Sequence, residues 1–277
     1  MLRFGYISNG FADHSLEQMI QVLERVGYQG IGITLDHHHL DPFKATPEEL
    51  DALRDRLKEA RLEPVIETGA RYFLDAFRKH RPSLLSVEPL ARRRRVIYYK
   101  RAIEVAKALG ASVVSLWSGV PQERLAAERC WVSLVDGLRE VLDHAQEHGV
   151  VIGFEPEPGM FVESMAHFDE LKERIPHPAL GLTLDLGHVT ITEEPPFEGV
   201  IERYRDSIVN VHIEDIRNRE HVHLPFGDGE IDFPPLLAKL KEIGYRGVVQ
   251  VELSRHSPEA PHQAQRSLVF LRGAEGA

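Results

Sequence analysis

Four polar residues stand directly at the ends of short apolar runs in the C-terminal half of the chain. They are Glu155 after Val-Ile-Gly-Phe, Asp185 after Leu-Thr-Leu, His212 after Val-Asn-Val and Glu252 after Val-Gln-Val. Carboxylates that met at one point would repel one another unless a cation lay between them. Three oxygen ligands and one nitrogen ligand suit a divalent ion such as Mn²⁺, Mg²⁺, Co²⁺ or Zn²⁺. The pattern therefore predicts a metal site, and the alternative is that each residue caps its own strand.

A further histidine, His188, follows Asp185 by three residues in Asp-Leu-Gly-His. A turn just beyond a strand would bring both side chains to one site. There His188 could support a ligand, donate a hydrogen bond to a substrate or bind a metal itself. A loop histidine without a role is the alternative.

The elements that must position these residues alternate between short apolar runs and longer amphipathic stretches. The runs that predict strands are Phe4–Ile7, Gly30–Thr34, Glu63–Glu67, Ser112–Leu116, Val150–Glu155, Leu180–Asp185, Ser207–His212 and Gly247–Glu252. Helical periodicity, caps and breakers predict helices between and after the strands. These helices cover Ser15–Val26, Thr46–Ala60, Arg93–Leu109, a stretch that ends near His148, Ser164–Arg174, Phe197–Tyr204, Phe233–Ile243 and Pro258–Arg272.

Eight strand–helix units in 277 residues are typical of a (β/α)8 TIM barrel, in which a unit takes about 31 residues. Runs such as Val-Val-Ile-Gly-Phe are almost continuously apolar, as parallel strands covered on both faces should be. A doubly wound open sheet is the alternative. We find no low-complexity linker, so we expect one domain over residues 1–277. In a barrel, the four candidate ligands would all point into the mouth at the C-terminal ends of neighbouring strands.

The composition limits the class of protein and its partners. The chain has 33 Lys and Arg against 43 Asp and Glu, and this acidic balance argues against nucleic acid as a partner. No run approaches the roughly 18 apolar residues of a membrane span, and the N-terminus lacks the pattern of a signal peptide. The single cysteine, Cys130, excludes an intramolecular disulfide framework, so we interpret it as a packing residue and expect a cytoplasmic protein.

The sequence resembles the xylose isomerase-like TIM-barrel superfamily, and within it the sugar phosphate isomerase/epimerase group. The resemblance covers essentially the whole chain. It rests on five ordered segments: Phe154-Glu155-Pro156, Leu184-Asp185-Leu186-Gly187-His188, Val211-His212-Ile213-Glu214-Asp215, Pro225 to Phe233 (PFGDGEIDF) and Val251-Glu252-Leu253. It implies that Glu155, Asp185, His212 and Glu252 hold one divalent metal. It further implies that the two glutamates act as acid and base, and that His188 and Arg217 bind the substrate.

The resemblance implies a metal-dependent isomerase or epimerase that acts on a sugar or sugar phosphate. Proton transfer beside a sugar carbonyl needs a base at the carbon and a cation that stabilises the developing enediolate. A dehydratase acting on a polyol ketone could use the same site, expelling a β-hydroxyl group from the same enolate. A catalytically silent sugar-binding barrel ranks last, because all four ligand positions are filled. Whether two copies pair as a homodimer stays open.

A phosphoesterase of the endonuclease IV type, with two or three metals, is the alternative from another class. In that related branch an Asp-x-His pair in the loop after strand seven contributes to the metal cluster, and this chain has His221-Val-His223 there. A second metal would use His188, His223 and His37, the last from the triplet after strand two. The net charge of −10 and a glutamate, Glu67, at the end of strand three count against this function.

Two long loops, Thr68–Arg92 and Ile213–Asp232, follow the ends of strands and are expected to lie over the mouth. The first is basic and aromatic and contains Arg71, Arg78, Lys79, His80 and Arg81; as a lid it could hold a phosphate or carboxylate, or it could simply be solvated. Trp117 and Phe226 are candidates to stack on a sugar ring, although packing explains Trp117 equally well. We interpret the basic run Arg92–Arg95 as the solvated face of a helix rather than as a nucleic-acid contact.

Overall fold

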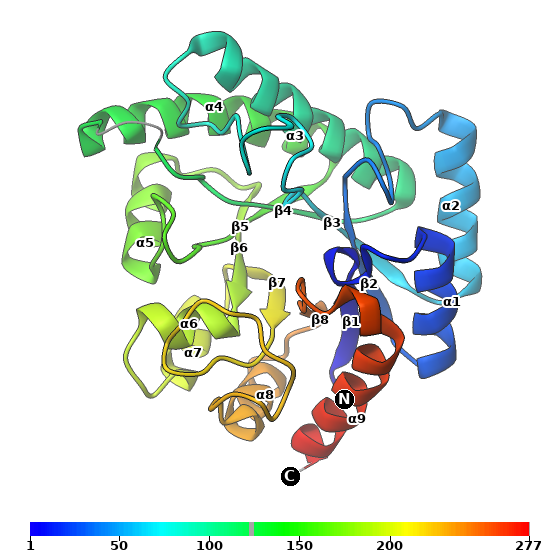
Figure 1. Ribbon diagram of the computed structural model, residues 1–277. Coiled ribbons are helices and arrows are strands. Elements are labelled where there is room, and N and C mark those ends of the chain that lie inside the picture. The colour runs from blue at the N-terminus through cyan, green and yellow to red at the C-terminus, as the bar shows by residue number, and fades with distance from the viewer. Residues whose placement is uncertain (122–124, 277) are drawn as a thin grey trace.

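The structure, a computed structural model, describes residues 1–121 and 125–276 and consists of a closed barrel surrounded by helices (Figure 1). Eight parallel strands pair in sequence order, and β8 closes the barrel on β1. The strands are β1 (Arg3–Ile7), β2 (Gly30–Thr34), β3 (Glu63–Glu67), β4 (Val113–Leu116), β5 (Val151–Phe154), β6 (Leu180–Asp185), β7 (Ile208–Ile213) and β8 (Val248–Val251). This architecture confirms the predicted (β/α)8 TIM barrel.

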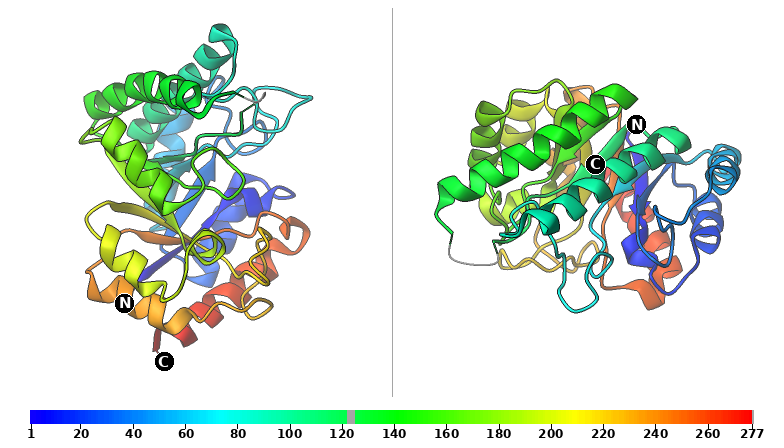
Figure 2. Two further views of the ribbon diagram at one scale, coloured as in Figure 1. Left: turned by 90° about the vertical axis from the view of Figure 1, so that its left-hand side faces the viewer. Right: turned by 90° about the horizontal axis from the view of Figure 1, so that it is seen from above.

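The helices form the outer ring, as the three views in Figures 1 and 2 show. They are α1 (Leu16–Val26), α2 (Pro47–Glu59), α3 (Pro89–Leu109), α4 (Ala127–His148), α5 (Met165–Arg174), α6 (Leu186–Thr192), α7 (Glu198–Tyr204), α8 (Phe233–Glu242) and α9 (Ala260–Gly276), with 3₁₀ turns η1 (Ser8–Phe11) and η2 (Ser257–Glu259). Among the described residues, no helix combines the length and apolar character that a membrane crossing requires.

Local sequence signals set where several helices begin and end. Thr46 accepts a hydrogen bond from the backbone N–H of Glu49, whose carboxylate accepts one from the N–H of Thr46, and Pro47 follows at the first helical position. Helix α1 begins with the same reciprocal cap and ends at Gly27, whose φ of 100° favours glycine. These caps direct each chain segment back towards the next strand.

The apolar core lies between the strands and the helices, and most strands contribute alternate residues to it, such as Ile31 and Ile33 of β2. Inside the barrel the strands pack too closely for larger residues in some places: a Cβ on Gly153 would collide with the hydroxyl of Thr183. That hydroxyl donates to Ser115 Oγ at 3.1 Å, so a small polar layer lies below the mouth. The barrel is therefore filled, and open space begins only at the C-terminal ends of the strands.

The loop from β7 to α8 is held by one buried carboxylate, that of Asp215. Its Oδ1 accepts hydrogen bonds from the backbone N–H groups of Ile216 and Ile231, and its Oδ2 accepts from those of Gly227 and Gly229, at 2.9–3.1 Å. The backbone of Asp215 also pairs in both directions with that of Leu224. These bonds fold the loop back across the mouth of the barrel.

Two elements differ from the sequence-based expectation. We expected a turn after β6, but residues 186–192 form helix α6, and the carboxylate of Asp185 caps it by accepting a bond from the N–H of His188 at 2.8 Å. Helix α3 begins at Pro89, four residues before the expected start, because proline is favoured at the first helical position.

Candidate metal and substrate site

The four candidate ligands come together at the mouth of the barrel from four neighbouring strands. Glu155 follows β5, Asp185 ends β6, His212 lies in β7 and Glu252 follows β8. One ligand atom of each lies within 4.8 Å of the corresponding atoms of the other three. His212 Nδ1 is 3.0 Å from Glu155 Oε1 and 3.3 Å from Glu252 Oε2. The order of the strands thus places three carboxylates and one imidazole around one point.

This donor set fits a divalent cation. Asp185 Oδ2 is buried and has no hydrogen-bond partner among the described residues, which is costly for a carboxylate oxygen unless another group satisfies it. His212 turns Nδ1 towards Glu155 and Glu252, and its Nε2 faces Glu67 Oε1 at 3.1 Å. A carboxylate behind a ligand histidine fixes the ring and its tautomer.

The pKa values of these groups move in opposite directions. Burial raises the pKa of Glu155 to about 8, and the charges of Glu252 and Asp185 add to the rise, although His212 opposes it. Burial would also raise the pKa of Glu252, but hydrogen bonds from His212 and Asn9 outweigh it and hold the pKa well below its usual range. Without a cation, two neighbouring glutamates therefore differ sharply in how readily they hold a proton.

The remaining ligands are affected by the same charges. Burial opposes the charged form of His212, but the charges of Glu67 and Glu155 outweigh it and raise the pKa well above its ordinary value. For Asp185, burial acts to raise the pKa, but the charges of His188 and His212 bring the pKa below its ordinary value. The metal-free site thus keeps a proton on His212, which supplies positive charge among the carboxylates.

Three side chains that support these ligands were not predicted as site residues. Glu67, at the end of β3, contacts His212 Nε2; the Asn210 amide lies 2.9 Å from the same nitrogen. Asn9, in η1, donates to Glu252 Oε1 at 2.8 Å. Glu67 shows the same signal as the four ligands, a carboxylate at the end of an apolar run, and that signal could have placed it here.

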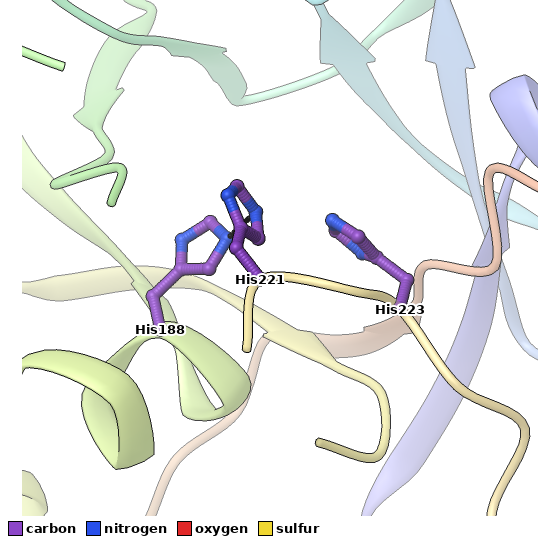
Figure 3. Close-up of side chains that lie close together, drawn as sticks. All are labelled: His188, His221 and His223. Atoms are coloured by element: carbon purple, nitrogen blue, oxygen red, sulfur yellow. Dashed lines mark hydrogen bonds between the residues drawn. The ribbon is translucent and has the colours of Figure 1, made fainter. Parts of the chain in front are cut away.

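A group of three histidines lies beside the four ligands (Figure 3). His188, on α6, and His221, in the loop after β7, are joined at 3.1 Å between their Nε2 atoms. His223 presents its ring to both, and one nitrogen of each of the three histidines lies within 4.8 Å of the others. His188 also contacts the backbone O of Pro156 through Nδ1 at 3.2 Å.

The predicted second-metal residues are only partly brought together. His188 and His223 lie side by side, but the third member of the group is His221, not His37. His37 lies on the outer wall of the cavity, where its ring packs on Phe73 with centroids 4.5 Å apart and Nδ1 is 3.5 Å from an Asp41 oxygen. The prediction failed at His37 because the triplet lies on the part of the cavity wall that follows β2, where the rings of the other two contact backbone oxygens near η1.

Three of the candidate ligands, Glu155, His212 and Glu252, form the floor of a cavity of about 410 Å³, and Asp185 is buried and is not among its lining residues. Its walls come from the loops after β1, β2, β3, β7 and β8, and its size suits a small polar molecule. Trp117, at the end of β4, lines the cavity, and the ring of His80 meets it edge-on at 4.9 Å. A larger hollow of about 1140 Å³ lies outside the barrel between α1 and α9 and is lined by none of the candidate ligands.

A model of the xylose isomerase-like TIM barrel family matches residues 20–274 of the chain. The chain belongs to this family. Among the sequence relatives, an uncharacterized protein (MJ1311) of Methanocaldococcus jannaschii is 28% identical over 91% of this chain and 83% of its own. L-ribulose-5-phosphate 3-epimerase UlaE of Salmonella paratyphi C is 27% identical over 80% of both chains. An inosose dehydratase of Geobacillus kaustophilus is 33% identical, but the match spans only 48% of each chain.

Solved structures share the fold of this family member over almost its whole length. A D-tagatose 3-epimerase-like protein gives a TM-score of 0.78 at 23% identity, covering 98% of this chain and 99% of its own. The IOLI protein, whose crystal structure contains a zinc atom, gives a TM-score of 0.75 at 21% identity, covering 98% of both chains. Such likeness shows the fold, and the chemistry must be argued from the residues.

Two residues expected in the substrate site of this family member lie elsewhere. Arg217 is exposed, its guanidinium donates to the backbone O of Asp228, and it is not among the described residues that line the cavity. Phe226 is buried against Phe233 and Phe270, with ring centroids 5.2 and 5.4 Å away. The loop held by Asp215 turns both positions away from the cavity. We therefore correct both expectations.

Arg95 also corrects an expectation, because it is not part of a solvated helix face. Its side chain is fully buried, and its guanidinium donates to the backbone O of Pro82 at 2.6 Å and of His80 at 3.2 Å. The guanidinium carbon lies 5.3 Å from the ring centres of Tyr98, Tyr99 and Trp117. Arg95 therefore ties the basic loop to the wall of the cavity. Cys130 is buried, as expected of a packing residue.

Proposed function

We propose that the chain is a divalent-metal-dependent isomerase or epimerase of a sugar or sugar phosphate that transfers a proton beside a carbonyl group. The observation that carries the proposal is the cluster of Glu155, Asp185, His212 and Glu252, whose ligand atoms lie within 4.8 Å of one another and of which all but Asp185 line one cavity. The relative named as an L-ribulose-5-phosphate 3-epimerase, which this chain matches over 80% of its length, supports the same reaction class.

Glu155, Asp185, His212 and Glu252 would hold the ion. When bound, the ion supplies positive charge that stabilises the oxyanion developing on the substrate carbonyl. Glu67 keeps the imidazole of His212 oriented by accepting from its Nε2, and the amide of Asn210 donates to the same oxygen of Glu67 at 3.3 Å. Asn9 fixes the carboxylate of Glu252 by donating to its Oε1.

We assign proton transfer to the two glutamates. The pKa of Glu252 is held below its usual range, so this carboxylate is ionised and can take a proton from the carbon beside the carbonyl. Glu155, also a ligand in this proposal, holds a proton more readily than Glu252 in the metal-free site, and in the proposed reaction it is the group that gives a proton to the other side of the substrate. Return to the opposite face of the same carbon inverts that centre, whereas return to the neighbouring carbon moves the carbonyl.

Trp117 would position the substrate at the cavity wall, and His188 would do so through His221, the cavity-lining histidine that its Nε2 contacts at 3.1 Å. Burial lowers the pKa of His188 to about 4, so its ring is neutral near pH 7 and can both donate and accept a hydrogen bond. Trp117 offers a flat apolar surface on the cavity wall on which a sugar carbon chain can lie. These contacts suit a small polyhydroxylated ligand rather than a polymer.

Deuterium exchange tests the reaction class with a panel of candidate substrates rather than with a single one. Protein loaded with Mn²⁺ is incubated in D₂O with a set of ketoses and ketose phosphates, and ¹H NMR follows the proton beside the carbonyl. We expect exchange with at least one panel member, and at least a hundredfold slower exchange in Glu155→Gln and Glu252→Gln. Turnover that survives Glu155→Gln with metal bound would contradict the acid–base assignment.

A dehydratase reaction is the second candidate, favoured by the 33% identity to an inosose dehydratase over about half of the chain. The same base would remove the same proton, and a hydroxyl group on the next carbon would leave as water. The same experiment with inosose in the panel separates the two. A product that has lost water identifies the dehydratase, whereas a product of unchanged mass identifies the isomerase or epimerase.

A further inference from the structure

The rim of the cavity has the opposite charge to its floor. Arg71 and Lys79, in the loop after β3, and Arg255, after β8, line the cavity above the carboxylates. Within the described part of the chain, none of the three has a carboxylate within 4.0 Å. By contrast Arg78, in the same loop, pairs with Asp75 at 2.7 Å and does not line the cavity. Among the described residues the three rim cations therefore face the cavity without an ion pair in contact, although the carboxyl of Glu157, which also lines the cavity, acts on Lys79 from a greater distance.

The structure holds this rim in place. The backbone N–H of His80 donates to the backbone O of Arg71 at 2.6 Å, which closes the loop that carries both Arg71 and Lys79. The guanidinium of Arg71 donates to the backbone O of Ser254 at 3.0 Å. Ser254 and Arg255 come directly after the β8 end that carries Glu252. Arg71 is thus fixed beside the end of β8 that carries Glu252, and all three cations line the same cavity as Glu155 and Glu252, so one small molecule in it can contact both groups.

The electrostatics of the rim agree with this geometry. Burial and then the charge of Arg71 lower the pKa of Lys79, and Arg255 contributes in the same direction, although the charge of Glu157 opposes them. Burial lowers the pKa of His80 to about 3, followed by the charges of Lys79 and Arg95. Positive charges that repel one another in this way lose that penalty when an anion binds between them.

We propose that Arg71, Lys79 and Arg255 bind the phosphate group of a sugar phosphate whose carbonyl end lies over Glu155 and Glu252. This inference rests on the proposed function and narrows its substrate class from sugars in general to phosphorylated sugars. Two guanidinium groups and one ammonium group match the several oxygens and the double negative charge of a phosphate monoester. A neutral sugar would leave the three cations without a partner.

Binding to the full-length, metal-loaded protein tests the inference. Isothermal titration calorimetry compares L-ribulose 5-phosphate, L-ribulose and inorganic phosphate, with Glu155→Gln as the host so that turnover does not interfere. We expect the phosphate ester to bind at least about tenfold more tightly than the free ketose, and each of Arg71→Ala, Lys79→Ala and Arg255→Ala to lower that affinity about tenfold. Binding of inorganic phosphate should weaken in the same variants. Arg78→Ala is the matched control and should leave all three affinities unchanged.

The outcomes separate this inference from the proposed function. Three results would overturn the phosphate site. They are equal affinity for L-ribulose 5-phosphate and L-ribulose, no binding of L-ribulose 5-phosphate or inorganic phosphate, and a preference for the ester that survives the three rim substitutions. A sugar carboxylate, 5-keto-D-gluconate, forms a further arm: binding as tight as that of the ester would overturn the choice of phosphate. The protein could prefer the phosphate ester, lose that preference in the three rim variants and yet exchange no substrate proton. This result would uphold the phosphate site and contradict the proposed reaction.

Discussion

Glu67 lies behind His212, with its Oε1 3.1 Å from Nε2, on the opposite side of the imidazole from Glu155 and Glu252. The ring therefore lies between carboxylates on both edges. In the proposed metal site Nε2 carries the proton, donates it to Glu67 and leaves Nδ1 free for the ion. The ligand set is thereby linked to β3, a strand that contributes none of the four ligands.

Removing the carboxylate of Glu67 should weaken the metal site without removing a ligand. We expect Glu67→Gln to lower the affinity for Mn²⁺ or Zn²⁺ by about 10- to 100-fold, because the orientation and basicity of His212 depend on this contact. Calorimetric titration of the metal-free protein measures the change. Glu63→Gln, at the other end of β3 and paired with Arg3, is the control and should bind metal like the wild type. An unchanged affinity in Glu67→Gln would show that the contact does not support the ligand.

The metal-free protein should lose stability as the pH rises from about 6.5 through 8. Glu155, with a pKa of about 8, and His212, with a raised pKa, keep protons in the folded state that the unfolded chain has already released in this range. Because the folded state binds more protons, its free energy of unfolding falls with increasing pH. We expect the Tm to drop by at least about 3 °C between pH 6.5 and 8.5.

Added metal should reverse this trend, because the ion binds the deprotonated ligands and binding therefore strengthens as the pH rises. Differential scanning fluorimetry with EDTA and with excess Mn²⁺ measures both curves. A Tm that rises with pH in EDTA would contradict the protonation of Glu155 and His212 in the metal-free site.

The metal content distinguishes one-metal proton transfer from multi-metal phosphoester hydrolysis. We expect one divalent ion per chain by elemental analysis. This metal content should stay unchanged in His221→Ala and His223→Ala, because neither His221 nor His223 is among the four candidate ligands. Two or three ions per chain, with one lost on either substitution, would make the group of His188, His221 and His223 a second metal site. Hydrolysis of abasic-site DNA would then become the first activity to measure.

Arg95 should stabilise the protein far more than a neighbouring arginine on the same helix. Arg95→Ala removes two hydrogen bonds to the loop and the contacts with three aromatic rings, so we expect a loss of about 2–4 kcal/mol in the free energy of unfolding. Arg93→Ala removes only an exposed pair with Glu140 and should cost about 0.5 kcal/mol or less. Urea unfolding at one pH measures both values, and equal losses would contradict this role of Arg95.

The sequence predicted the barrel and its strands well because each strand is a compact apolar run with polar or turn residues beside it. The predicted bounds of β2, β3 and β6 agree with the structure. The four candidate ligands come together because residues at the ends of parallel strands share one edge of the barrel. The position of these four residues depends only on where the strands end, and the apolar runs in the sequence indicate those ends directly.

The rest of the site depends on loop geometry and helix orientation, which the pattern does not give. The approach of His221 to His188 follows from a loop that one carboxylate folds, and nothing local to His221 signals it. The same folding turns Arg217 outward. Arg95 belongs to a run of four arginines whose composition indicates exposure, and only its position on the inner face of α3 buries it.

The carboxylate of Asp215 holds the loop after β7 entirely through backbone N–H groups. Apart from Arg219 and His223, whose side chains contact backbone oxygens of Thr190 and Glu252, a backbone held in this way makes few demands on the side chains between its anchor points. Substitutions at His221 and its neighbours can therefore change which molecules the mouth accepts while the path of the chain stays the same. Because Asp215 fixes the path of the loop after β7, single substitutions within this loop can give the protein new substrate preferences.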